Sequence, residues 1–283
     1  MQRTLGVALG GGGARGFAHV GVLLELERAG LRPKVVAGTS MGAIVGAMYA
    51  VGQDLEKLMQ VLEFLDLREI FGITESYRRM LEELVLRSLV SHLRRGGEGG
   101  GVPERLLKLY SLLRLLCKGK RFEDLEVPFA AVAADLLTGE EVVIRQGPLY
   151  RGVAASAALP GVFAPVRWRG RRLIDGGVVN NLPVDVAAEL GAEVVLAVEV
   201  SAPLKQEVNS TVEVILQSYA ITSKELVRAK LELARTYLDD RVVVIRPRVE
   251  GIGVLEFHRL EEAFAAGREA AAAVIGRLRK LLD

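Results

Sequence analysis

The feature that most constrains this chain is an uncharged stretch of nineteen residues, 35–53, which contains the G-x-S-x-G sequence of residues 38–42. β-Branched valines precede the motif, and small or apolar residues follow it at spacings that suit a buried helix. Such a motif turns a strand sharply into a helix and exposes the serine, and a side chain at Gly38 or Gly42 would collide with the adjoining elements. Ser40 is therefore the first candidate nucleophile.

Two plainer interpretations of residues 35–53 are a transmembrane helix and an ordinary core helix. The stretch is long enough to span a bilayer. However, it contains four glycines, and Pro33 just before it is typical of a loop that enters a strand. We therefore favour a strand, a turn and a helix.

Composition limits the class of protein. The chain has 283 residues, half of them hydrophobic, which predicts one domain over residues 1–283 with an insertion. A net charge of +2 argues against a dedicated nucleic-acid-binding protein. The single cysteine, Cys117, excludes an intramolecular disulfide, and the N-terminus lacks the apolar run of a secretory signal. We expect a cytoplasmic protein, and the sequence does not indicate its oligomeric state.

Strand-like and helix-like segments alternate along the chain. This order predicts an α/β fold with three α/β/α layers around a mostly parallel central sheet. We expect strands at residues 5–9, 35–37, 129–133, 142–144, 194–200 and 242–245, and helices at residues 14–29, 184–190, 212–238 and 260–282.

Residues 68–121 depart from this alternation and are predicted to form a helical cap. Two amphipathic helices, at 77–95 and 103–118, flank a glycine-rich joint, and the segment has twelve Lys or Arg residues against six Asp or Glu. A basic, leucine-rich helix suits a lid at a membrane surface, because cations attract anionic headgroups. A cap packed on the sheet is the simpler interpretation and the one we favour.

The first predicted strand leads into a glycine-rich loop, Gly11-Gly12-Gly13-Ala14-Arg15-Gly16. This pattern is shared with dinucleotide sites, but those need an acidic residue at the end of the next strand, and here that strand ends in Ala37-Gly38-Thr39. The alternative is an anion site, because consecutive glycines let backbone N–H groups converge before a helix. An oxyanion formed when Ser40 attacks a carbonyl is such an anion.

A serine nucleophile also needs a base. Asp175 ends a short apolar segment and is followed by Gly176 and Gly177, which keep the approach open. Taken alone, Asp175 is more often a residue that caps its turn. An aspartate with an ordinary pKa of about 3.9 is a weak base, so burial or direct contact with Ser40 would be required.

These three elements, in this order, resemble the patatin-like phospholipase family, and residues 155–165 resemble the block that precedes its aspartate. The similarity runs from Leu5 to about Pro183, and it is strongest to short bacterial members related to the catalytic domain of neuropathy target esterase.

The resemblance implies a serine lipid acyl hydrolase that cleaves carboxylic esters of phospholipids, lysophospholipids or related acyl esters. It implies a dyad of Ser40 as nucleophile and Asp175 as base, which forms and then hydrolyses an acyl-enzyme. It implies an oxyanion hole at Gly11, Gly12 and Gly13. Supporting positions are Arg15, Gly16, Gly38, Gly42, Gly176 and Gly177. No metal or cofactor is expected, and the partner is a lipid or acyl-ester substrate, with contact to the inner membrane surface if the cap acts as a lid.

Three alternatives stay open at this point. An α/β-hydrolase would use Ser40, Asp175 and His258, which occur in the right chain order, although only one strand is predicted before residue 35. A regulator would bind an acyl lipid without turnover. Transfer of the acyl group to an acceptor other than water would use the same residues as hydrolysis.

Overall fold

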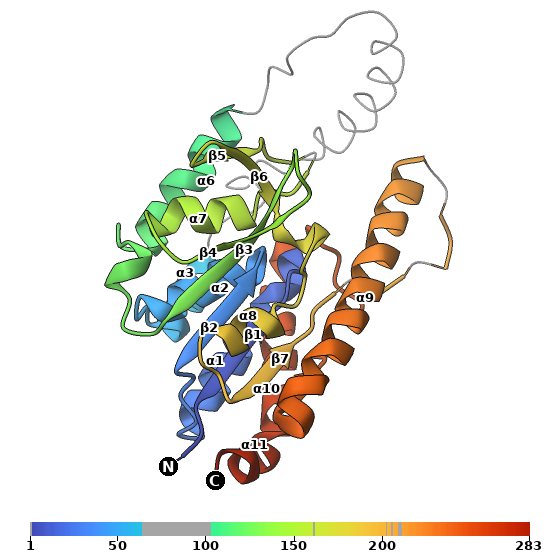
Figure 1. Cartoon of the computed structure of the whole chain (residues 1–283). Helices are drawn as coiled ribbons and strands as arrows, with labels where there is room; N and C mark the ends of the chain where they lie inside the picture. Colours follow the sequence, from blue (N-terminus) through green and yellow to red (C-terminus); the bar gives the residue numbers. More distant parts are fainter. Residues whose placement is uncertain (1, 64–102, 161, 202, 205, 209–210) are drawn as a thin grey trace, which may run out of the picture.

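The computed structural model describes residues 2–63, 103–160, 162–201, 203–204, 206–208 and 211–283 (Figure 1). Within this part of the chain, one sheet of eight strands forms the centre of the molecule. The strands are β1 (Leu5–Leu9), β2 (Val35–Thr39), β3 (Phe129–Asp135), β4 (Glu141–Ile144), β5 (Val166–Trp168), β6 (Arg171–Asp175), β7 (Val194–Val198) and β8 (Val242–Ile245).

The sheet is mixed but mostly parallel. Its order is β5-β6-β3-β2-β1-β7-β8, with β4 paired to β3. Strands β3, β2, β1, β7 and β8 are parallel to one another, whereas β4, β5 and β6 join by antiparallel pairs. The parallel strands are nearly continuous apolar runs because helices cover both of their faces.

Helices on the two faces of the sheet complete the three layers (Figure 1). They are α1 (Ala18–Arg28), α2 (Met41–Ala50), α3 (Leu55–Glu63), α6 (Pro103–Leu116), α7 (Leu149–Ser156), α8 (Val184–Glu189), α9 (Thr211–Leu238), α10 (Leu260–Ala272) and α11 (Ile275–Leu282). One core contains side chains of α1, α2, α6, α7, α10 and α11, and the other contains side chains of α8 and α9. The predicted α/β/α fold is confirmed.

The register of β3 explains how distant parts of the chain meet. Thr39, the last residue of β2, pairs with Val132, while Asp175, the last residue of β6, pairs with Ala133. Because β4 occupies the other edge of β3, β6 pairs with the same edge as β2, and its last residue lies where β2 ends. Asp175 therefore lies beside the turn that follows Thr39.

Several predicted boundaries need correction. The helix expected at 14–29 begins as a 3₁₀ turn, Gly13–Phe17, before α1. The helix expected at 260–282 is two helices, because the Val274 N–H bonds to the Ala271 carbonyl in a tighter turn, where the φ of Val274 is −112°. Helix α7 and strand β5 were not predicted, since both are too short for their periodicity to stand out.

The predicted cap is described only in part. Its helix at 77–95 and its glycine-rich joint lie outside the described residues, and the helix at 103–118 is α6. Leu109 and Leu113 of α6 are buried in the core, whereas Leu115 is 75% exposed. From Leu109 onward, where its side chains are described, α6 thus packs most of its apolar face internally.

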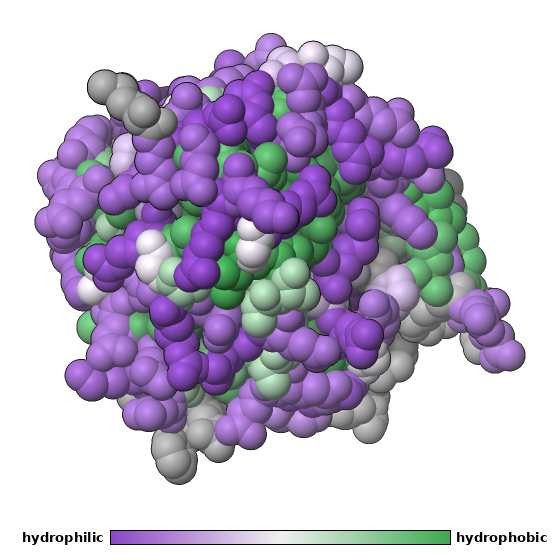
Figure 2. All heavy atoms as spheres, turned by 90° about the horizontal axis from the view of Figure 1, so that it is seen from below, coloured by the Kyte–Doolittle hydropathy of each residue, from purple (hydrophilic) through white to green (hydrophobic). Residues whose placement is uncertain are grey.

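The surface at one end of the sheet is polar, as expected when the apolar side chains pack in the core. The face at the amino ends of the parallel strands, which carries both termini, is mostly hydrophilic (Figure 2). None of the helices in the described part of the chain combines the length and the apolar character needed to cross a bilayer. Residues 35–53 form β2, a turn and α2, as predicted.

Candidate active site

Ser40 occupies the turn between β2 and α2. Its backbone conformation, with φ 56° and ψ −121°, is one that residues other than glycine rarely adopt. The two flanking glycines make this turn possible. A Cβ at Gly38 would collide with the Gly42 carbonyl, and a Cβ at Gly42 would collide with the Leu9 carbonyl at the end of β1. The strain is retained because the surrounding backbone leaves the turn no room to relax.

Two hydrogen bonds hold the turn from other elements. The Ser40 N–H donates to the hydroxyl of Ser156, at the end of α7, over 2.9 Å. The hydroxyl of Thr39 donates to the Asn180 carbonyl over 2.8 Å. Ser156 and Thr39 are completely buried, so these bonds fix the turn without competition from water.

Asp175 is the buried carboxylate next to Ser40. It begins the 3₁₀ turn Gly176–Val178, and its Oδ1 accepts a 2.8 Å hydrogen bond from the Gly177 N–H. Its side chain is 2% exposed, and within the described part of the chain Oδ2 has no hydrogen bond of ordinary geometry. Burial raises the pKa of Asp175 to about 6, and interactions with the Ser40 hydroxyl and the Gly177 N–H offset part of this rise. Asp175 is therefore a stronger base than an exposed aspartate.

The glycine-rich loop lies on the other side of Ser40. A Cβ at Gly11 would come within 3.1 Å of the Ser40 Cβ. The Gly11 N–H is already used, because it donates to the Asn181 carbonyl over 3.0 Å. Among the described residues, the N–H groups of Gly12 and Gly13 have no hydrogen-bond acceptor. Of the three donors expected from sequence, these two are available to an anion.

Arg15 fixes this loop. It is only 3% exposed, and its Nε donates to the Ile252 carbonyl over 2.7 Å while Nη1 reaches the Val200 carbonyl at 3.5 Å. Burial lowers the pKa of Arg15, and the nearby Glu256 opposes that shift. Gly16 lets the same loop approach α2, since a Cβ there would collide with Met41. The guanidinium thus binds backbone carbonyls.

His19 and the triad candidate His258 lie in different surroundings. His19 is fully buried on α1, and its Nε2 is 2.7 Å from the Gly10 carbonyl. Burial lowers the pKa of His19 to about 4, so it is neutral at pH 7. His258 lies in the 3₁₀ turn Phe257–Arg259, where its charge acts on Glu256.

Two residues near Asp175 were missed by the sequence analysis. Asn180 follows the Asp175 turn and forms hydrogen bonds through its Nδ2 and its backbone carbonyl, and the Tyr219 hydroxyl of α9 lies against Gly177. Burial and the charge of Asp175 raise the pKa of Tyr219. Neither residue belongs to a local sequence motif, because each is brought close to Asp175 only when α8 and α9 pack on the sheet.

In the residues that the structure describes, no group of three or more His, Cys, Asp or Glu side chains converges as metal ligands would. The chemistry available at Ser40 is that of a strained hydroxyl, a buried carboxylate and free backbone N–H groups.

This arrangement can be compared with known proteins. The sequence model of a family described as "Patatin-like phospholipase" matches residues 7–188, about two thirds of the chain, and the matched part includes both Ser40 and Asp175. The chain belongs to the patatin-like phospholipase family.

Relatives within this family come from bacteria and mammals. An uncharacterized NTE family protein of Mycobacterium tuberculosis, Rv1063c, is 33% identical over 195 residues, which cover 69% of this chain and 48% of that protein. A second, Rv2565, is 31% identical over 96% of this chain and 46% of its own length. Patatin-like phospholipase domain-containing protein 6 of mouse is 34% identical over 70% of this chain and 13% of its own. This chain spans about half the length of the mycobacterial relatives.

Solved structures of bacterial proteins align with this patatin-like chain at low identity. VipD from Legionella pneumophila aligns over 98% of this chain and 67% of its own, with 15% identity and a TM-score of 0.49. The type III effector ExoU aligns over 100% of this chain and 54% of its own, with 18% identity and a TM-score of 0.49.

Proposed function

We propose that this protein is a serine lipid acyl hydrolase in which Ser40 is the nucleophile and Asp175 the general base. The observation that carries the proposal is the position of a strained, glycine-flanked serine beside a buried carboxylate whose pKa responds to the serine hydroxyl. Membership of the patatin-like phospholipase family supports the same chemistry.

The reaction follows from these groups. The Ser40 oxygen attacks the ester carbonyl carbon while Asp175 takes the hydroxyl proton, and the carbonyl oxygen becomes an oxyanion that accepts hydrogen bonds from Gly12 and Gly13. Collapse of this intermediate breaks the ester bond, and the leaving alcohol receives the proton from Asp175. Water, deprotonated by Asp175, then attacks the acyl-enzyme and releases the carboxylic acid and free Ser40.

An acyl chain is the substrate group that the surroundings favour. Val254 lies against Gly13, and Val254 and its neighbour Leu255 are each 37% exposed. Apolar side chains next to the free N–H groups suit a substrate whose carbonyl is attached to a hydrocarbon. Esters of phospholipids and lysophospholipids, and simpler acyl esters, have this chemistry.

The test uses purified wild type and Ser40→Ala with a short-chain nitrophenyl ester, a fluorescent phospholipid and a fluorophosphonate probe. We expect wild type to hydrolyse at least one substrate and to gain one phosphonate on Ser40 by intact mass. Ser40→Ala, with an unchanged circular dichroism spectrum, should do neither.

Two results would overturn the proposal. Equal turnover by Ser40→Ala would point to another nucleophile. Binding of a fluorescent fatty acid by wild type, without turnover or labelling of Ser40, would instead favour a regulator that senses acyl lipids.

A further inference from the structure

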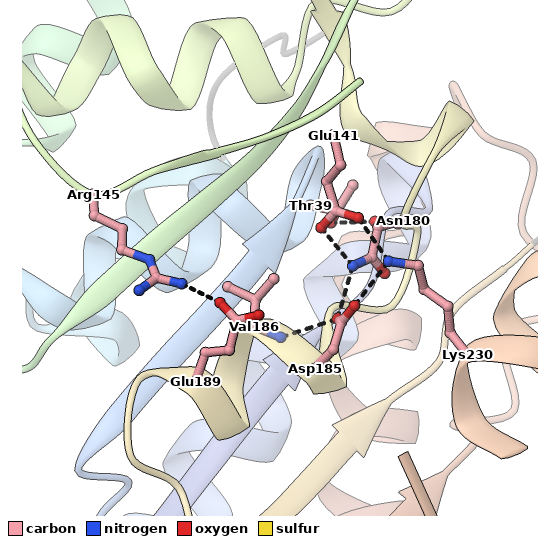
Figure 3. Close-up of polar contacts among 8 residues, drawn as sticks. All are labelled: Thr39, Glu141, Arg145, Asn180, Asp185, Val186, Glu189 and Lys230. Atoms are coloured by element: carbon pink, nitrogen blue, oxygen red, sulfur yellow. Dashed lines mark hydrogen bonds and ion pairs between the residues drawn. The ribbon is translucent and has the colours of Figure 1, made fainter. Parts of the chain in front are cut away.

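A cluster of charged side chains from β4, α8 and α9 lies near Thr39, the residue before Ser40 (Figure 3). Lys230 of α9 bonds to Glu141 Oε2 of β4 over 2.6 Å and to Asp185 Oδ2 of α8 over 2.8 Å. Although burial opposes its charge, the hydrogen bonds to both carboxylates raise the pKa of Lys230. We call Lys230, Glu141 and Asp185 the charge clamp.

The remaining carboxylate oxygens of the clamp hold Asn180. Its Nδ2 donates to Glu141 Oε1 over 2.9 Å and to Asp185 Oδ1 over 2.8 Å (Figure 3). Asn180 is 1% exposed, so both amide hydrogens are used by the clamp and shielded from water. One amide therefore joins two carboxylates, and one lysine offsets part of their negative charge.

The backbone of Asn180 reaches both halves of the proposed dyad. Its carbonyl accepts the hydrogen bond from Thr39, the residue before Ser40, and its N–H donates to the Gly176 carbonyl, the residue after Asp175, over 2.8 Å. A shift of Asn180 would therefore move the Ser40 turn and the Asp175 turn relative to each other. Misplacement by about 1 Å can cost roughly a hundredfold in rate.

We propose that the charge clamp positions the reacting groups, with Lys230 as a positioning residue that acts through Asn180 on the distance between Ser40 and Asp175. This inference rests on the proposed function, and it concerns residues outside the glycine-rich loop, the serine turn and the aspartate turn. The expected effect falls on kcat, because the clamp does not touch Gly12, Gly13 or Val254, where the substrate would bind.

The experiment compares Lys230→Met with a matched control, Lys224→Met, an exposed lysine on the same helix. With the short-chain nitrophenyl ester, we expect Lys230→Met to lower kcat about tenfold or more and to leave KM within about twofold. Lys224→Met should match wild type in both constants.

Two rescue variants separate positioning from a loss of stability. Lys230→Arg keeps the cation and should recover most of kcat. The double variant Lys230→Met with Glu141→Gln removes one uncompensated carboxylate yet keeps an acceptor for Asn180, so it should be more active than Lys230→Met alone. If Lys230→Met does not fold, Lys230→Gln takes its place in the comparison.

A folded Lys230→Met with wild-type kcat would overturn the inference, as would a loss of kcat that neither rescue variant reduces. Wild type and Ser40→Ala in the same assay test the proposed function separately. If wild type shows neither turnover nor labelling, amide hydrogen exchange of peptides spanning residues 36–44 and 175–183 decides the role of the clamp. Faster exchange in Lys230→Met, but not in Lys224→Met, would support it, and equal exchange would contradict it.

Discussion

Different interactions stabilise the Ser40 turn on the two faces of the sheet. On the side of α1 and α2, it is held by the absence of side chains, because Gly38 and Gly42 let backbones touch. On the side of α8 and α9, it is held by the charge clamp through Asn180. The first side depends mainly on sterics, with the hydrogen bond to Ser156 of α7 as its polar contact, and the second depends on polar contacts alone.

The difference shows which changes each side should tolerate. A glycine whose missing Cβ faces a carbonyl cannot be replaced without moving backbone. A cluster of charges can be altered in steps, because a substitution that removes a cation can be balanced by one that removes a carboxylate. The steric side should therefore respond to substitution mainly in stability, and the charged side mainly in rate.

Asp175, where the two sides meet, should give the largest effect. Asp175→Asn keeps the size of the side chain and an acceptor for Gly177, but removes the base, so we expect kcat to fall by roughly 10²–10⁴. In wild type, kcat/KM should fall tenfold per pH unit below about 6, where the carboxylate becomes protonated. Wild-type activity that stays level down to pH 4.5 would contradict this assignment.

The same substitution should stabilise the protein. The pKa of Asp175 is raised from 3.8 to about 6 on folding, so its favourable contribution is complete below pH 3.8 and is lost as the pH rises through 6. Above pH 6 the ionised carboxylate costs up to about 3 kcal/mol, which Asp175→Asn avoids. Urea midpoints of the two proteins should be similar near pH 4 and separate by pH 7. A wild type that is the more stable at pH 7 would refute the buried-charge explanation.

The steric side is tested by placing the same methyl group at two helical glycines. Gly42→Ala puts a Cβ against the Leu9 carbonyl and should lower the free energy of unfolding by about 1–3 kcal/mol. Gly276→Ala, on the exposed side of α11, meets no atom within 4 Å and should raise it by about 0.5–1 kcal/mol. Urea denaturation measures both, and a Gly42→Ala protein as stable as wild type would remove the steric half of the comparison.

The steric side could be predicted from sequence, whereas the charged side could not. Gly38 and Gly42 flank Ser40 within five residues, so a local motif encodes that turn. Lys230 lies 45 residues from Asp185 and 89 from Glu141, and none of the three stands in a recognisable pattern. Their contact depends on which face of α9 meets the sheet, and that is fixed only when Val227 and Leu231 pack in the core. The availability of Gly12 and Gly13, but not of Gly11, likewise depends on a distant carbonyl, that of Asn181.

The smallest effect is expected at His258, which belongs to neither side. The 3₁₀ turn of His258 precedes α10, and its charge acts on Glu256, whereas the groups that shift the pKa of Asp175 are Ser40 and Gly177. If Ser40 and Asp175 act as a dyad, His258→Ala should keep kcat/KM within about twofold of wild type, because no proton passes through the imidazole. The nitrophenyl ester assay at pH 8 measures this. A fall to the level of Ser40→Ala would make His258 the base, reduce Asp175 to its orienting partner and replace the dyad with a triad.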